Sequence, residues 1–532
     1  MNEQGLIQAS AGQSHIIHPF PVEAGAEWIA FKVAPRPRED GKPVTLADRY
    51  SLGYYIFVFD SADRLRLHYY IVYDSKYALI HREPGATSYA AVPGPLPVGE
   101  WQICIVPNNP ARGPYSYDVT WQQGSGAIPA GWEIPAEERD YWSTASTDRS
   151  VFSMNLLDRA QIKQPAARWY RGDLHVHTHL SDGTTSPAEV MQEAEMCGFD
   201  FLMIADHNLM MPSWPRGQDR VMFVPGVELS TRWGDMNIIG LSEGPDFREL
   251  INESGIADIS AILRYLRQTR EAGAIVCMNH PFIQGGYWNF GELPLDEIDV
   301  LEIWNYACHP SQPEAVEHTL KIWNFLWNDG RTLPGVSGTD SHGGPIFPRT
   351  AQDPPFVDWN LLLFIYANGL SVDHLLQGIL QRQVYATRGP YLDAEITVGT
   401  EKFGIGADVT QAVDACAGET AEVNYVLRVS NPGSGAIHWI EDGREVAVQP
   451  VAGEGDYGFR FCWRAGEYHW ARAEIRALNG SLQAFVNPIF SGRKEPVLHT
   501  WQELLDVADI GDSFRQPYAL HQAQKKDRED SN

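Results

Sequence analysis

The chain has 532 residues, of which 44% are apolar, and a formal net charge of −27 at pH 7. This length exceeds what one hydrophobic core usually serves, so about two to four domains are expected. The negative charge repels polyanions, and no basic stripe interleaved with aromatic residues is present, which argues against a nucleic-acid polymer as a partner. The longest apolar runs are far shorter than the roughly 20 residues that cross a bilayer, so no membrane segment is expected.

The N-terminus and the cysteines bear on the cellular compartment. No basic segment followed by an apolar one opens the chain, so a secretory signal is not evident. The six cysteines are scattered without Cys-x-x-Cys pairs, which favours buried free thiols over disulfides. Both features predict a cytoplasmic protein.

Residues 1–166 show patterns that are typical of β-structure. The runs YYIFVFD and RLHYYIVYD are rich in aromatic and β-branched residues, and Pro and Gly stand at the expected turns. The sequence therefore predicts an N-terminal β-sandwich, or a jelly-roll-like domain, over residues 1–166.

Strand-like and helix-like segments alternate between residues 167 and 390. The runs LHVHTHL, FDFLMIADH and AIVCMNHP have the pattern of strands, whereas SPAEVMQEAEMCG and PEAVEHTLKIWNFLWNDG have helical spacing. Strand alternating with helix predicts an α/β domain with a parallel core that is closed or nearly closed.

The last part of the chain returns to a β-pattern. Apolar residues alternate from Val423 to Val429, and Asp442 followed by glycine is a hairpin signal. A second β-sandwich is expected over residues 391–495. Residues 496–532 are expected to hold a helix and a charge-rich, disordered tail.

Side chains that suit metal ions stand at the ends of five predicted strands. His175 and His177 are two residues apart on one strand, so both imidazoles lie on one face, and the same spacing relates Asp340 and His342. The other three ends carry Asp206, His207, Glu228 and His280. One histidine at a strand end is usually structural, but five such ends in an α/β fold favour a multinuclear metal centre of imidazoles and carboxylates.

The motifs DLHVHTHLSDG, ADHN, GVE, NHP and GTDSH, in this order and spacing, resemble the polymerase and histidinol phosphatase (PHP) family of metal-dependent hydrolases. The resemblance covers about residues 171–390. The preceding β-module and the later YATRGPYL resemble, more narrowly, the branch that includes a carbaryl (carbamate ester) hydrolase. The resemblance implies a distorted (β/α)7 barrel between the two β-sandwich domains, with up to three ions, usually zinc, manganese or iron.

Carried over motif by motif, the resemblance implies three metal positions. Their ligands would be His175, His177 and Asp340 at the first position, Glu228 bridging to a second that His280 holds, and Asp182, His207 and His342 at the third.

One position departs from the pattern of this branch. Where relatives often have Gly-His-x-Asn after the bridging glutamate, this chain reads GDMN, with Asp235 in place of the histidine. Asp235 is either an oxygen ligand or the mark of a weak second position. Two or three divalent ions are therefore expected.

Three further residues are candidate catalytic residues beside the ions. Asp206 is more suited to orient a neighbouring ligand than to bind an ion. Arg388, in YATRGP, either offers a planar donor to a phosphate or carboxylate or is a surface arginine paired with an acidic residue. His309, just past the predicted strand VLEIWNY, either lines the pocket or is structural.

The centre itself predicts the class of reaction. Divalent ions activate water near neutral pH, so no serine or cysteine nucleophile is needed. Because the ions outweigh the charge of the ligand carboxylates, a small anionic ester is the expected substrate, and phosphomonoesters or phosphodiesters fit best. Two alternatives stay open: a carboxylic or carbamate ester hydrolase that uses the same centre, and a non-catalytic PHP scaffold or binding module. The oligomeric state is not indicated.

Overall fold

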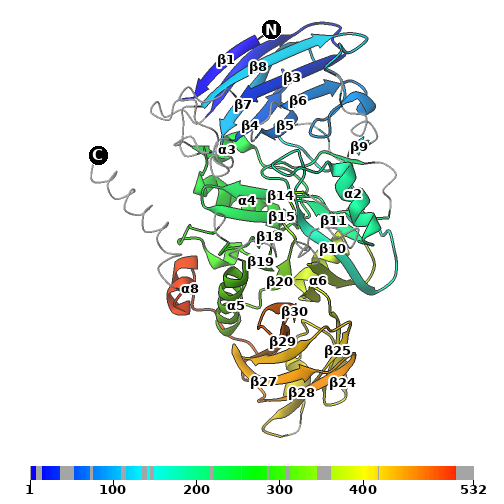
Figure 1. Cartoon of the computed structure of the whole chain (residues 1–532). Helices are drawn as coiled ribbons and strands as arrows, with labels where there is room; N and C mark the ends of the chain where they lie inside the picture. The colour runs from blue at the N-terminus through cyan, green and yellow to red at the C-terminus, as the bar shows by residue number, and fades with distance from the viewer. Residues whose placement is uncertain are drawn as a thin grey trace, which may run out of the picture.

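The computed structural model describes residues 2–7, 15–35, 53–71, 76–108, 115–132, 134, 141–143, 146, 149–215, 220–252, 255–283, 287–305, 312–343, 361–416 and 418–510. Figure 1 shows strands of the N-terminal part at the top, a mixed α/β part in the middle and the C-terminal strands at the bottom. The described chain is therefore a sheet-rich α/β protein.

Two four-stranded antiparallel sheets form the N-terminal part. The first has the order β1 (Asn2–Ile7), β8 (Tyr115–Gly124), β3 (Trp28–Pro35) and β6 (Lys76–His81). The second has the order β2 (Ile16–Val22), β7 (Gly99–Pro107), β4 (Tyr54–Phe59) and β5 (Leu65–Ile71). The sheets pack face to face, and the rings of Phe20 and Phe31 meet across the gap at 5.4 Å. Every residue of β4 and β5 is buried, since their other face is covered by the central part.

The central strands belong to two sheets. One begins with β13 (Met222–Phe223), β11 (Phe201–Ile204), β10 (Arg168–Val176), β21 (Leu362–Ala367) and β22 (Val384–Thr387). The other has the order β14 (Gly226–Thr231), β15 (Gly234–Ile239), β18 (Ile275–Met278), β19 (Val300–Trp304) and β20 (Gly335–Ser337). As expected, β10 with β11 and β18 with β19 and β20 are parallel pairs. However, β21 and β15 run antiparallel to both of their neighbours, so the central sheets are mixed and not parallel throughout.

A closed (β/α)7 barrel is not shown by the residues that the structure describes. The two central sheets meet through isolated parallel bridges, between Val176 and Ser341 and between His207 and Glu228, rather than through continuous ladders. Beyond Val176 the chain leaves the strand and enters the turns that lead to Asp182.

A local signal sets the start of the first helix of the central part. The helix expected in SPAEVMQEAEMCG is present and begins at Pro187, where Ser186 and Glu189 form a capping box. The helices of this part are α2 (Pro187–Met196), α3 (Phe247–Leu250), α4 (Ile259–Glu271), α5 (Gln312–Asn328) and α6 (Val372–Leu380). Short elements are β9 (Tyr141–Ser143), β12 (Ser213–Pro215), β16 (Ile251–Asn252), β17 (Gly255–Ile256), and the 3₁₀ turns η2 (Pro84–Ala86) and η5 (Leu295–Glu297).

The first central sheet continues into the C-terminal part. Strand β22 pairs with β30 (Leu482–Val486), and the sheet goes on through β29 (His469–Ala477), β26 (Gly435–Glu441) and β27 (Arg444–Val451), with β31 (Ile489–Ser491) beside β29. A four-stranded sheet, β24 (Glu401–Phe403), β23 (Tyr391–Val398), β25 (Ala421–Ser430) and β28 (Gly455–Trp463), completes this part with α7 (Thr410–Asp414). Hydrogen bonds of one sheet thus cross the domain boundary expected at residue 390.

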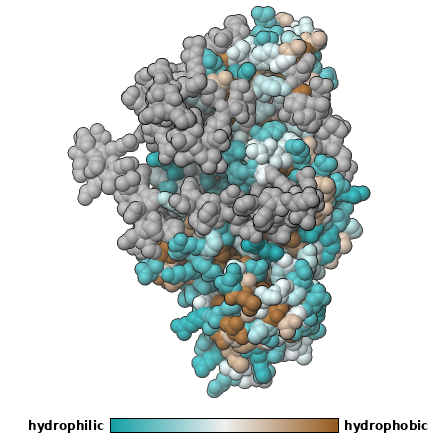
Figure 2. Space-filling model, in the orientation of Figure 1, coloured by the Kyte–Doolittle hydropathy of each residue, from teal (hydrophilic) through white to brown (hydrophobic). Residues whose placement is uncertain are grey.

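The predicted C-terminal helix is present as α8 (Trp501–Ala508), which packs Trp501 against Phe282 with ring centroids 6.0 Å apart. The expected disordered tail from residue 511 onward lies outside the described residues. On the face in Figure 2, hydrophobic residues gather over the C-terminal strands. There β27 forms the edge of its sheet, and Val446 and Val448 of that strand are exposed.

The expectation of buried free thiols is met in part, since of the cysteines described only Cys104 and Cys277 are buried and Cys462 is exposed. The five cysteines described are all free thiols, namely Cys104, Cys197, Cys277, Cys416 and Cys462. No helix of the described chain has both the length and the apolar character needed to span a membrane.

Candidate metal centre

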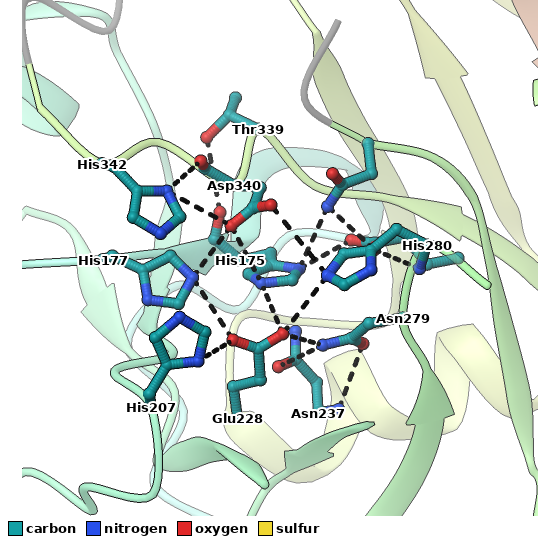
Figure 3. Close-up of polar contacts among 12 residues, drawn as sticks. His175, His177, His207, Glu228, Asn237, Asn279, His280, Thr339, Asp340 and His342 are labelled. Carbon is teal, nitrogen blue, oxygen red and sulfur yellow. Dashed lines mark hydrogen bonds and ion pairs between the residues drawn. The ribbon is translucent and has the colours of Figure 1, made fainter. Parts of the chain in front are cut away.

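The eight ligands that the family resemblance implies come together at one end of the central strands. Each lies on a strand or just beyond its end: His175, His177 and Asp182 at β10, His207 at β11, Glu228 at β14, His280 at β18, and Asp340 and His342 at β20. Figure 3 shows the imidazoles and carboxylates pointing toward one another around Glu228 and Asp340. Both imidazoles of the His-x-His pair, His175 and His177, are fully buried.

The predicted ligands form three overlapping groups. Within each group, one ligand atom from every residue lies within 4.8 Å of the ligand atoms of the others. The groups are His175 with His177 and Asp340, His175 with Glu228 and His280, and His177 with Asp182, His207 and His342. These groups match the three positions expected from the sequence, except that His175 and His177 are each shared by two of them. Sharing is a consequence of the His-x-His spacing, because both rings stand on the same face of one strand.

The buried polar atoms of the centre fit metal ions. Within the described chain, several of them form no hydrogen bond: Nε2 of His175, Nδ1 of His177, Oδ2 of Asp182 and Nδ1 of His280. An unpaired buried donor or acceptor costs about 1–3 kcal/mol. Ions bound between these atoms would remove that cost, and imidazole with carboxylate is the donor set that borderline divalent ions accept.

The carboxylates of the centre are held in their charged form. Burial raises the pKa of Asp182, but the positive charge of His207 and His342 outweighs it and lowers this pKa well below its usual range. The same opposition lowers the pKa of Glu228, through His207 and His175. The carboxylates of the cavity therefore stay ionised and available to bind cations.

The histidines respond in the opposite direction. Burial lowers the pKa of His280 and His342, but neighbouring carboxylates outweigh it and raise each pKa to about 9. For His177, burial together with the charges on His342 and His207 lowers the pKa. Protons on the imidazoles thus balance the carboxylates, and divalent ions would replace those protons when they bind.

Backbone strain coincides with the centre. Asp340 and His280 have φ of 52° and 24°, and Asn208, next to His207, has φ of 52°. Residues other than glycine pay about 1–3 kcal/mol for this conformation, and such strain is concentrated at functional sites.

Glu302 is an important residue of the centre that the sequence analysis missed. It lies on β19, is 2% exposed, and accepts a hydrogen bond from Nδ1 of His175 at 2.9 Å. Its other oxygen accepts from the backbone N–H of His280 at 3.0 Å and from Nδ2 of Asn305 at 2.9 Å. One carboxylate thereby orients two predicted ligands. A charged residue inside the apolar run VLEIW was the only available signal.

Amide side chains orient the central glutamate. Nδ2 of Asn279 donates to Oε1 of Glu228 at 2.7 Å and to Oδ1 of Asn237 at 3.0 Å. Asn237 also donates to the carbonyl of Leu174 in β10 at 3.1 Å. This chain of amides leaves Oε2 of Glu228 directed into the centre.

Asp235 belongs to none of the three ligand groups of the described residues. Asp235 lies opposite Ser230 in the hairpin of β14 and β15. Burial and, to a smaller extent, the negative charge of Glu228 raise the pKa of Asp235 to about 6. The expectation that Asp235 is an oxygen ligand stays a prediction.

The three candidate catalytic residues have different outcomes. The Asp206 carboxylate accepts from the N–H of Thr178 at 2.7 Å and from the hydroxyls of Thr178 and Ser181, so it shapes the turn that carries Asp182 and stays away from the ligand groups. Adjacent residues point to opposite sides of an extended chain, which separates Asp206 from His207. Arg388 is half-buried, with its guanidinium 5.8 Å from the ring of Trp304. His309 lies outside the described residues.

No family model matches the chain, and no curated protein matches it. Solved structures that resemble it are distant. One is a two-domain protein from Bacteroides vulgatus containing a predicted PHP-like metal-dependent phosphoesterase, with 15% identity and a TM-score of 0.34 over 62% of this chain and 99% of that chain. Another is an amidohydrolase from Chromobacterium violaceum, with 18% identity and a TM-score of 0.23 over 35% of this chain and 92% of that chain. At these TM-scores the likenesses assign neither a fold nor a function.

Proposed function

We propose that this chain is a metal-dependent hydrolase of the PHP kind that cleaves small phosphomonoesters or phosphodiesters. The observation that carries the proposal is the set of three overlapping groups of imidazoles and carboxylates. Within each group the ligand atoms lie within 4.8 Å of one another. Two or three ions of zinc, manganese or iron suit this donor set.

Charge favours an anionic substrate. Two or three divalent ions carry more positive charge than Asp182, Glu228 and Asp340 neutralise, so the loaded centre attracts anions. When bound, the ions would hold the oxygens of a phosphate ester and activate water for attack on phosphorus.

The protein side chains define the direction of access. The side chain of His342 is 28% exposed and that of His207 18%, whereas those of His175 and His177 are 1% and 0% exposed. A substrate therefore reaches the centre over His342 and His207, while the His-x-His pair forms the floor that is closed to bulk water.

The test is a hydrolysis panel on zinc-loaded and manganese-loaded protein. The substrates are p-nitrophenyl phosphate, bis(p-nitrophenyl) phosphate, and a neutral aryl ester or carbamate. His177→Ala is the inactive reference, because His177 belongs to two ligand groups. The matched control is His438→Ala, which removes a histidine of β26 in the C-terminal part. We expect turnover of phosphate esters that His177→Ala lowers by more than about 100-fold and the control leaves unchanged.

The other outcomes separate the alternatives. Turnover of the neutral ester alone would select a carboxylic or carbamate ester hydrolase with the same centre. Metal binding without hydrolysis of any ester would select a non-catalytic scaffold or binding module. A His177→Ala variant that keeps a third or more of the activity would argue against hydrolysis at this centre altogether.

A further inference from the structure

The N-terminal sheet of β4 and β5 holds the two loops that follow β10 and β11. The backbone N–H of Tyr70 donates to the carbonyl of Leu180 at 3.3 Å. Nε2 of His68 lies 2.9 Å from the carbonyl oxygen of Met210, and this histidine is buried. Since the first loop carries Asp182 and the second begins at His207, the N-terminal part contacts both sides of one ligand group.

Asn208 is the residue at which these parts are joined. It is 1% exposed, and its Nδ2 donates to the hydroxyl of Tyr55 in β4 at 2.9 Å and to the carbonyl of Ser230 in β14 at 2.8 Å. Its Oδ1 accepts from the N–H of Ser230 at 3.0 Å. One buried amide therefore connects the N-terminal sheet, the His207 loop and β14.

The same connection controls the imidazole of His207. Its Nδ1 lies 2.5 Å from the hydroxyl oxygen of Ser230 and 2.7 Å from Oε2 of Glu228. With Nδ1 held in this way, Nε2 faces Asp182 at 3.4 Å. Asn208 therefore holds the backbone of the residue whose hydroxyl lies beside this imidazole.

Two tyrosines complete the support. The rings of Tyr55 and Tyr70 stack with centroids 4.5 Å apart, and Tyr70 meets the ring of His207 edge-on at 6.5 Å. The fit is tight, since a Cβ on Gly53 would stand 2.4 Å from the hydroxyl oxygen of Tyr70. The tyrosines thus form a rigid wall behind the imidazole.

We propose that Tyr55 and Asn208 are positioning residues for the metal position formed by Asp182, His207 and His342. The N-terminal β-sandwich would then help to hold the ligands of this metal position in place. The inference rests on the proposed function, because it concerns the same centre. Supporting hydrogen bonds around metal ligands typically change metal affinity by about 10- to 100-fold. The hydroxyl of Tyr55 is therefore expected to matter for one metal position and not for the others.

The experiment compares Tyr55→Phe and Asn208→Ala with wild-type protein. Tyr425→Phe is the matched control, because Tyr425 is also fully buried but lies on β25 in the C-terminal part. Zinc per chain is measured over a series of buffered free-zinc concentrations, and melting temperatures are recorded with zinc and with a chelator. In Tyr55→Phe we expect one zinc position to lose about 10-fold in affinity while the others stay unchanged, with a larger loss in Asn208→Ala. The control should bind zinc as the wild type does.

Each contrary result has a distinct meaning. Wild-type zinc affinity at all positions in folded Tyr55→Phe would overturn this inference and leave the proposed function intact. A fall in melting temperature that is equal with and without zinc, at unchanged affinity, would show that Tyr55 only stabilises the fold, which also overturns it. A wild-type chain that binds less than one zinc would overturn the proposed function and this inference together. If Asn208→Ala does not fold, the milder Tyr55→Phe decides.

Discussion

The role of His175 depends on which of its two ring nitrogens is left free. Nδ1 is held by Glu302 at 2.9 Å, so Nε2 is presented to Glu228 at 3.2 Å and to Asp340 at 3.3 Å. A carboxylate in this place selects the tautomer and strengthens the nitrogen that binds the ion. At the residue scale, therefore, the metal centre extends beyond the atoms that could touch an ion.

Glu302→Gln tests this role with little change in shape. The amide keeps an acceptor for Nδ1 of His175 but removes the negative charge, so we expect zinc affinity to fall about 10- to 100-fold. Competition with a chromophoric chelator measures the affinity. Glu445→Gln, in an exposed position on β27, removes the same charge as a control. Equal affinities in the two variants would contradict the assigned role.

At the scale of elements, a single side chain joins the short strand β20 to β22. Asn487, which follows β30 and is fully buried, accepts from the N–H of Gly335 at 2.7 Å. It also donates to the carbonyls of Gly335 at 2.8 Å and Val384 at 3.0 Å. These hydrogen bonds fix the three-residue strand β20 in place. Asp340 and His342 follow this strand in the chain, so their positions depend on it.

Asn487→Ala removes the partner of two buried backbone groups of Gly335. An unsatisfied buried group costs about 1–3 kcal/mol, so the free energy of unfolding should fall by about 3 kcal/mol. Urea denaturation followed by fluorescence measures the change. Asn479→Ala, at an exposed turn, should change the free energy by less than about 0.5 kcal/mol. A similarly small effect in Asn487→Ala would show that water replaces the lost bonds.

At the scale of the whole molecule, the central and C-terminal parts share one sheet and one core. Strand β22 pairs with β30, and Trp323 and Trp327 of α5 pack against Phe485 and Trp470 with ring centroids 5.6 and 5.8 Å apart. Large apolar side chains on both sides of the expected boundary at residue 390 thus depend on each other for burial.

A chain truncated after residue 390 is therefore expected to lose cooperative unfolding. It would leave β22 without its partner and expose the tryptophans of α5 to water. Thermal melting followed by circular dichroism tests this, with a chain truncated after residue 510 as the control that keeps α8. Cooperative melting together with zinc binding by residues 1–390 would instead support an independent domain that ends there.

The sequence by itself determined the local features. The two-residue period of a strand places His175 and His177 on one face, and the capping residue Ser186 sets the start of α2, because both depend only on neighbours along the chain. The same local reasoning identified the other ligand types and the β-pattern at both ends. It left the role of Asp235 open, because the pairing of β14 with β15 decides which way the chain presents this side chain.

The tertiary structure alone decided how these features combine. His175 and Glu302 are 127 residues apart in the chain, and Tyr55 and Asn208 are 153 apart. The approach of His207 and His342 to His177 and the sheet that crosses residue 390 likewise come from packing of distant segments. Such contacts leave no periodic trace in the sequence, because a hydrogen bond between remote residues requires only that the fold bring their atoms within about 3 Å.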